Sequence, residues 1–210
     1  MRVVLVHGLL RTRWSLRRLA RALRAEGCQP ELFGYVAARE SFESIAARLA
    51  ARLERADGAW CAVGHSLGGL LLRAAISTLP SERRASRLVQ LGTPNVSPRL
   101  ARRLHRTLPY RVLHGDSGRL LADPERMARL PWPGVPVTVV AGTAGPRGRF
   151  SPFGGDPNDG LVAVEETTWP GAERVELPVR HTFMMNDREV RRVVLRRCGD
   201  AAAGRSRGQS

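Results

Sequence analysis

The sequence has 210 residues and a mass of 23.1 kDa, which fits one ordinary domain and leaves little room for a second domain with its own core. Hydrophobic residues make up 43% and charged residues 25%, so wholesale disorder and a membrane-embedded fold are poor interpretations. The net charge is +15 and the sequence contains no lysine, so arginine carries the whole excess. We interpret this as a compositional bias expressed on solvated helix faces, with attraction to an anionic partner as the alternative.

Short apolar runs alternate with helical patterns along the chain, which is typical of β-α-β units and a parallel sheet. The runs are strand-sized and fall short of the roughly 20 residues that a membrane span needs. They predict strands at Val3–His7, Glu31–Tyr35, Trp60–Gly64, Arg87–Leu91, Val135–Ala141 and Arg174–Pro178. The predicted fold class is therefore α/β, a doubly wound, mostly parallel sheet of about six strands with helices on both faces.

Three helices are predicted between these strands. Apolar residues recur at helical spacing from Trp14 to Leu23 and again from Phe42 to Leu53, where Ser41 is a suitable N-cap. The third helix follows Ser66, and its apolar residues cover most of its circumference, so we expect it to be buried at the centre of the fold.

The pattern becomes irregular in the middle of the chain, where prolines flank two short predicted helices, Arg99–Leu108 and Leu120–Leu130. We therefore expect one domain over residues 1–198 with a cap-like insertion at about 95–134. A closing helix is predicted over Asp187–Cys198, and residues 199–210 are predicted to be a disordered polar tail. Whether the insertion is a mobile lid does not follow from the pattern.

The run Gly64-His65-Ser66-Leu67-Gly68 places a G-x-S-x-G motif between a predicted strand and a predicted helix. A serine hydroxyl is a poor nucleophile, so acyl transfer needs it at an exposed point, beside a base and beside donors that stabilise an oxyanion. Gly64 and Gly68 lack the side chains that would clash across such a turn. The motif predicts Ser66 as a nucleophile; a tight turn that only happens to contain serine is the alternative.

Three further segments accompany this motif: an apolar start that runs into His-Gly, an Asn-Asp-Gly run, and a histidine after the last predicted strand, at Val3–Leu10, Asn158–Val162 and His181–Asn186. Together the four segments resemble the α/β-hydrolase superfamily, and more narrowly small bacterial lipases and esterases. The resemblance implies a catalytic triad of Ser66, Asp159 and His181, which stand in the chain order that this fold requires.

The resemblance also implies an oxyanion hole formed by the backbone N–H groups of Leu9 and Leu67, and it implies no metal and no cofactor. The acid has the most competitors, which are Asp116, Asp156, Glu165 and Glu166. Asp159 itself could be an ordinary turn residue, and His181 could be a surface histidine. His7 and His65 are expected to pack or form hydrogen bonds locally, and His105 and His114 lie in the predicted cap.

The hypothesis is a serine hydrolase that cleaves carboxylic esters through an acyl-enzyme on Ser66, with His181 as base and Asp159 as orienting acid. Apolar residues of the insertion could form a pocket for an acyl chain or pack on the core. A thioesterase, an amidase or an acyltransferase would use the same triad. From another class, the alternative is a non-catalytic hydrolase-fold protein that binds anionic partners through its arginine-rich surface.

The expected partner is a small ester or lipid substrate. Nucleic acid is not expected because few aromatic residues interleave with the arginines, while peripheral contact with an anionic membrane surface stays open. No secretory signal is evident after Arg2, and the three cysteines lack metal-ligand spacing, so we expect a cytoplasmic protein. The oligomeric state is not predicted.

Overall fold

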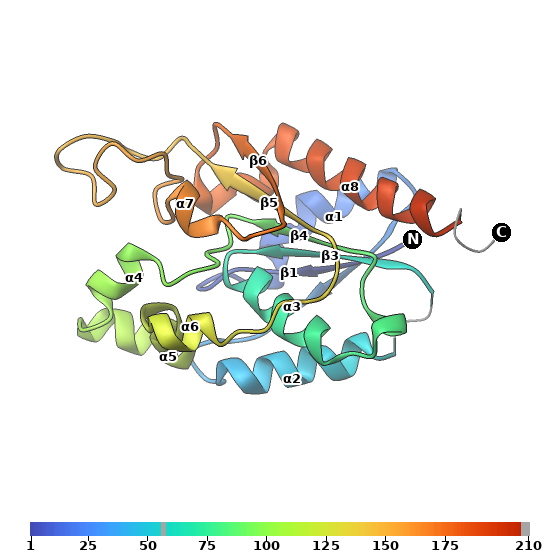
Figure 1. The fold of residues 1–210 in the computed structure, drawn as a ribbon, viewed down its shortest axis with the longest axis horizontal. Helices are drawn as coiled ribbons and strands as arrows, with labels where there is room; N and C mark the ends of the chain where they lie inside the picture. The colour runs from blue at the N-terminus through green and yellow to red at the C-terminus, as the bar shows by residue number, and fades with distance from the viewer. Residues whose placement is uncertain (56–57, 207–210) are drawn as a thin grey trace.

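The computed structural model describes residues 1–55 and 58–206. Within them, six parallel strands form one sheet in the order β2-β1-β3-β4-β5-β6. The strands are β1 Arg2–Val6, β2 Gln29–Phe33, β3 Trp60–His65, β4 Arg87–Leu91, β5 Val137–Gly142 and β6 Glu173–Leu177. Helices cover both faces of this sheet (Figure 1), so the predicted fold class is confirmed.

The largest error in a predicted strand concerns β2, which begins and ends two residues earlier than the sequence indicated. Pro30 lies within β2 and has no N–H group to donate to a neighbouring strand. β2 is an edge strand and pairs only with β1 in the described sheet, so proline is tolerated there.

The two faces of the sheet pack against different helices. Val4 and Val6 of β1 point into a core cluster with α2 (Phe42–Leu53) and α3 (Leu67–Thr78). Alternate residues of the same strand join a second cluster with α1 (Arg17–Ala25) and α8 (Arg188–Ser206). This alternation is the period of two expected for a strand buried on both faces. A single 3-10 turn, η1 (Arg13–Leu16), precedes α1.

The predicted cap at Ser41 and the predicted central helix are present. The Ser41 hydroxyl accepts a hydrogen bond from the Ser44 N–H at 3.1 Å, which caps α2. The leucines and Ile76 of α3 are fully buried, as its pattern predicted, while Ala74 is partly buried. Gly27, with φ of +73°, ends the turn after α1.

The cap, residues 95–134, forms three helices rather than the two predicted: α4 (Arg99–Leu104), α5 (Leu108–Ala122) and α6 (Pro124–Ala128). The first predicted helix ends at Leu108, just before Pro109. In the structure Pro109 lies in the first turn of α5, where a missing N–H costs nothing. Gly115, with φ of +55° and ψ of −142°, interrupts α5. The Asp123 carboxylate caps α6 by accepting from the Glu125 and Arg126 N–H groups.

One buried cation ties the cap to the central helix. Arg73 of α3 is fully buried and donates from Nε to the Pro131 carbonyl at 2.8 Å and from Nη1 to Asn95 Oδ1 at 3.3 Å. Its guanidinium lies 4.2 Å from the centroid of the Trp169 ring. Burial lowers the pKa of Arg73 to about 10, which still leaves it charged at neutral pH.

The end of the chain departs from its prediction. α8 runs on to Ser206 through part of the segment that we expected to be a disordered tail, because the run Ala201–Ala203 has high helix propensity. Residues 207–210 of the predicted tail lie outside the described residues. Cys198 of α8 contacts Cys61 of β3 in the core, with 2.8 Å between the sulfurs, and this contact together with burial raises the pKa of the Cys198 thiol.

The remaining short elements are η2 (Ser81–Arg83), α7 (Val164–Thr167) and η3 (His181–Asn186). Among the helices that the structure describes, none is long and apolar enough to cross a bilayer.

Candidate active site

Ser66 lies at the sharp turn between β3 and α3 with φ of +52° and ψ of −123°, a conformation that L-residues rarely adopt. The turn is tight enough to require glycine on both sides. A Cβ atom on Gly64 would lie 2.4 Å from the Gly69 nitrogen, and one on Gly68 would lie 2.3 Å from the Val6 carbonyl oxygen. The Ser66 N–H donates to the Leu91 carbonyl at 2.8 Å, which fixes the turn against β4.

Asp159 and His181 form a short, buried hydrogen bond. The distance from His181 Nδ1 to Asp159 Oδ2 is 2.6 Å, and the two residues are 5% and 2% exposed. Because a carboxylate only accepts, Nδ1 carries the proton and Nε2 is the acceptor nitrogen of the neutral ring. The His181 N–H also donates to the Asp159 carbonyl at 2.9 Å, so two bonds hold the base against the acid.

The Asp159 carboxylate is itself fixed in place. Its Oδ1 accepts from the N–H groups of Leu161 at 2.9 Å and Val162 at 2.8 Å. Two glycines make room for the pair: a Cβ atom on Gly92 would lie 3.0 Å from His181 Nδ1, and one on Gly142 would lie 2.7 Å from Asp159 Cβ. The acid therefore presents one oxygen to the backbone and the other to the histidine.

These residues come together because each follows a strand of the same parallel sheet. Ser66 follows β3, Asp159 lies in the segment after β5, and His181 begins η3 after β6. The carboxyl ends of parallel strands meet at one edge of a sheet, which is where such folds bind ligands. Leu9 follows β1 at the same edge, and Leu67 is the first residue of α3, whose first N–H groups have no partner within the helix.

A pocket of about 230 Å³ opens at this edge, and Leu9, Ser66 and His181 line it. Its other lining residues are mostly apolar and come from the cap and from the loops after β1, β4 and β5: Leu10, Pro94, Pro98, Leu100, Ala101, Leu104, Leu121, Leu161 and Val162. The pocket therefore joins the reactive groups to an apolar surface. Within the described residues, no three His, Cys, Asp or Glu side chains gather as metal ligands would.

The competing acids have other partners. Asp116 bonds Arg126 and the N–H group of Phe42, which places it in the cap. Asp156, Glu165 and Glu166 all pair with one residue, Arg99. Asp159 is therefore the candidate acid that the fold brings to His181.

Two further histidines border the site. His65 is buried, donates from Nε2 to the His181 carbonyl at 3.0 Å, and has no partner for Nδ1 within the described residues. Burial and the neighbouring His181 lower the pKa of His65 well below its ordinary value, so this ring is neutral.

The His7 ring stacks on Tyr35 and orients the loop that carries Leu9. Its Nε2 accepts from the Tyr35 N–H at 3.3 Å, so Nδ1 carries the proton and donates to the Gly8 carbonyl at 2.9 Å. The peptide that joins Gly8 to Leu9 is planar and trans, so fixing its carbonyl also fixes the direction of the Leu9 N–H.

Sequence reasoning missed the pocket residues Arg11, Tyr110, His114 and Thr182. Tyr110 and His114 are four residues apart and stack with 4.1 Å between ring centroids, a spacing that could have marked one helix face. Arg11 had no such signal, because the loop after β1 has no periodicity.

The run that follows β4, Gly92–Asn95, also touches the site. The Thr93 hydroxyl donates to the Ser66 carbonyl at 3.0 Å, and Pro94 lines the pocket.

Several solved structures with the same architecture are lipases or esterases. A lipase from Bacillus licheniformis in its mature form superposes with a TM-score of 0.69 at 20% identity, covering 86% of this chain and 84% of the lipase. A monoacylglycerol lipase from Paleococcus ferrophilus gives 0.65 at 19% identity over 95% and 94% of the two chains. A methylesterase from Arabidopsis gives 0.60 at 15% identity over 93% and 98%.

No family model matches the sequence, and no curated protein matches it. The structural similarity is nevertheless extensive and spans nearly the whole chain. The protein has the α/β-hydrolase fold, as the sequence motifs implied.

Proposed function

We propose that the protein is a serine hydrolase that cleaves carboxylic esters, with Ser66 as nucleophile, His181 as general base and Asp159 as the acid that orients the base. The observation that carries the proposal is the buried 2.6 Å bond between His181 and Asp159, next to a pocket that His181 shares with Ser66. The similar lipases and esterases support the reaction class through a shared fold.

In the proposed reaction, His181 Nε2 takes the proton of the Ser66 hydroxyl as its oxygen attacks the ester carbonyl carbon. The N–H groups of Leu9 and Leu67 donate to the oxyanion of the tetrahedral intermediate. Collapse of that intermediate breaks the ester bond, and His181 returns the proton to the leaving alcohol. Water, deprotonated by the same nitrogen, then releases the acid from Ser66.

The lining of the pocket supports an ester with an apolar acyl or alcohol group. Most of its side chains are aliphatic or proline, and apolar pockets with few convergent polar groups bind apolar ligands. Ser66 and His181 line the same pocket, and the ester carbonyl would lie beside them. A thioester or amide would meet the same groups, so the leaving group is the part of the proposal that needs direct measurement.

Labelling with a fluorophosphonate tests the nucleophile and the base. The wild-type protein should form an adduct on Ser66 that peptide mass spectrometry locates, and Ser66→Ala should abolish it. His181→Ala should slow labelling by at least about 10³-fold, because the hydroxyl then lacks its base. Ser44→Ala, an exposed serine on α2, is the matched control and should label as the wild type does.

An adduct elsewhere on the chain, or labelling of His181→Ala at the wild-type rate, would contradict the triad. A panel of acyl esters of graded chain length, with one thioester, one amide and one alcohol acceptor, then separates the alternatives. We expect the esters to give the highest kcat/KM. Turnover of the thioester alone would identify a thioesterase instead. Acyl transfer to the alcohol in preference to water would identify an acyltransferase.

A further inference from the structure

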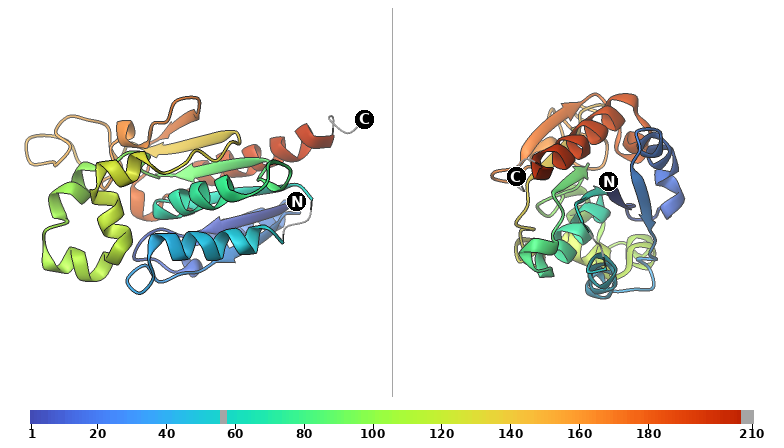
Figure 2. Two further views of the ribbon diagram at one scale, coloured as in Figure 1. Left: turned by 60° about the horizontal axis from the view of Figure 1, so that its bottom comes forward. Right: turned by 90° about the vertical axis from the view of Figure 1, so that its right-hand side faces the viewer.

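The end of the molecule that carries the pocket also carries several strongly exposed apolar side chains. Leu108, Val112 and Leu113 of α5 are 71%, 64% and 51% exposed, and Phe150, in the loop after β5, is 92% exposed. Figures 1 and 2 show α4, α5 and this loop projecting from the same end, beyond the carboxyl ends of the strands. One external surface can therefore contact both projections together.

The cap half of this end is also cationic. Residues 99–115 contain five arginines and no aspartate or glutamate. Arg102, Arg103, Arg106 and Arg111 are exposed and make no ion pair within the described residues. Positive charges without local partners favour an anionic partner from outside the chain.

Apolar and cationic side chains lie side by side here rather than in separate areas. A hollow of about 280 Å³ on α5 is lined by Leu108, Val112, Arg111 and Arg119. Phe150 has a cation next to it as well, because the Arg149 guanidinium lies 5.2 Å from the centroid of its ring. This mixture is typical of protein surfaces that lie at the boundary between lipid headgroups and acyl chains.

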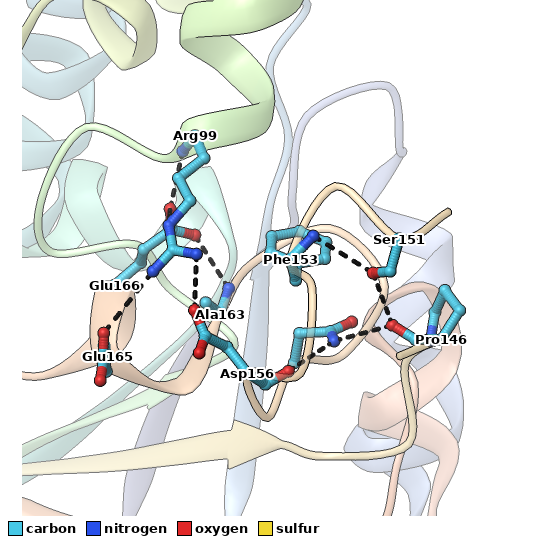
Figure 3. Close-up of polar contacts among 9 residues, drawn as sticks. Arg99, Pro146, Ser151, Phe153, Asp156, Ala163, Glu165 and Glu166 are labelled. Carbon is cyan, nitrogen blue, oxygen red and sulfur yellow. Dashed lines mark hydrogen bonds and ion pairs between the residues drawn. The ribbon is translucent and has the colours of Figure 1, made fainter. Parts of the chain in front are cut away.

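The loop that carries Phe150 is held by its own hydrogen bonds (Figure 3). The Ser151 hydroxyl donates to the Pro146 carbonyl at 2.8 Å and accepts from the Phe153 N–H at 3.2 Å. The Asn158 amide donates to the same carbonyl at 3.0 Å. Phe153 is 2% exposed, so the loop buries one phenylalanine as an anchor and exposes the other.

Arg99 connects this loop to the cap (Figure 3). Its guanidinium pairs with Asp156 at 2.6 Å, and its backbone N–H donates to Glu166 Oε1 at 2.7 Å. The second oxygen of Glu166 accepts from the Ala163 N–H at 2.8 Å. The first turn of α4 is thereby fixed to the segment that carries Asp159, so the two projections are held in one arrangement.

We propose that this end of the protein docks on an anionic phospholipid bilayer. The docking surface consists of Leu108, Val112, Leu113 and Phe150, which enter the headgroup region, and of Arg102, Arg103, Arg106 and Arg111, which bind lipid phosphates. Nucleic acid would match the arginines and leave the four apolar side chains unused, so the bilayer accounts for both sets.

Docking in this orientation places the pocket at the membrane. Leu10 and Leu161 line the pocket and are 59% and 44% exposed, so its rim is apolar. Delivery of an ester from the bilayer to Ser66 rests on the proposed function, whereas the docking itself does not.

Co-sedimentation with vesicles of ether-linked phospholipids tests the docking, because these lipids contain no ester to cleave. The wild type should bind vesicles of equal parts phosphatidylcholine and phosphatidylglycerol, release as salt is raised, and fail to bind phosphatidylcholine alone. The triple variant Arg102→Gln/Arg103→Gln/Arg106→Gln should bind at least about 100-fold more weakly, at about fivefold for each arginine. The triple variant Leu108→Ser/Val112→Ser/Phe150→Ser should also bind more weakly.

The matched control is Arg24→Gln/Arg55→Gln, which removes exposed arginines close to the amino ends of β2 and β3 and should bind as the wild type does. Fluorophosphonate labelling without vesicles should be equal in all these proteins, which separates a failed docking surface from a failed active site. Three results would overturn the proposal. The wild type could bind vesicles of phosphatidylcholine alone as well as the mixed vesicles, or the control variant could bind the mixed vesicles as weakly as the arginine variant does. The third result is an arginine variant that loses binding to duplex DNA but binds vesicles as the wild type does.

Discussion

The polar groups at the carboxyl edge of the sheet and the arginines on the cap surface differ in their burial and in their partners. At the sheet edge, Asp159 and His181 are buried and bonded to each other, and Arg73 of α3 is likewise buried among acceptors. On the cap, Arg102 and Arg106 are exposed and make no ion pair within the described residues. Burial requires partners inside the chain, whereas exposed charges are left for a partner outside it.

The largest expected effect comes from breaking the buried pair. Asp159→Asn keeps the size of the side chain but removes the acceptor that sets the tautomer of His181, so kcat/KM for a short acyl ester should fall by about 10³–10⁴-fold. Steady-state kinetics measures this, with the Tm followed to confirm folding. Asp156→Asn, in the neighbouring loop but bonded to Arg99, is the control, and an equal loss there would refute the assignment of the acid.

The next effect concerns the space around Ser66. In Gly68→Ala, the new Cβ atom would lie 2.3 Å from the Val6 carbonyl oxygen, a backbone atom that cannot move alone. We expect a loss of about 2–4 kcal/mol in unfolding free energy and a fall in Tm of roughly 5–15 °C. Gly155→Ala, in the exposed loop after β5, meets no atom within 4 Å and should change Tm little.

A smaller effect depends on pH. Burial, with a contribution from His181, holds the pKa of His65 well below 6.5, so the unfolded chain takes up a proton at this residue before the folded chain does. Stability from neutral His65 is therefore complete above pH 6.5 and is lost as the pH falls below it, by up to about 1.4 kcal/mol per pH unit. Urea unfolding measures the unfolding free energy at each pH between about 7.5 and 5. In His65→Asn this free energy should fall less steeply with decreasing pH than it does in the wild type. An equal fall of the unfolding free energy with pH in the variant and the wild type would contradict this account.

The smallest effect is expected on the cap surface. Arg106→Gln removes a charge that has no ion-pair partner among the described residues and several like charges nearby, so the unfolding free energy should change by less than about 0.5 kcal/mol. Thermal unfolding measures this. A fall of several degrees in Tm would mean that the cap arginines stabilise the fold. The two regions would then not differ in the way described above.

The sequence predicted the parts of the fold that repeat a simple pattern. β4 was predicted at its observed bounds, because Leu88, Val89 and Leu91 form a short apolar segment that is buried in the sheet. The bounds of α5 were not, because Pro109 and Gly115 usually end helices and here only begin and kink one. The three residues of the proposed triad came from motifs, and the structure places Asp159 against His181.

Other features of the site had no sequence signal. The burial of Arg73 depends on acceptors from two distant segments, and charged residues on a helix normally indicate a solvated position. The arginine excess was interpreted as compositional, and only the tertiary structure places part of it beside Phe150 and α5 at one end of the molecule. Contacts between segments far apart in the chain are not encoded in local periodicity.

The cap is one continuous stretch between β4 and β5, and none of the residues proposed for the triad or the oxyanion hole lies in it. Recombination or insertion within this stretch can therefore exchange pocket walls as a module, as long as Arg73 and Arg99 keep their partners at its two ends. For a designer, this makes residues 100–130 the natural target of a combinatorial library for new substrates.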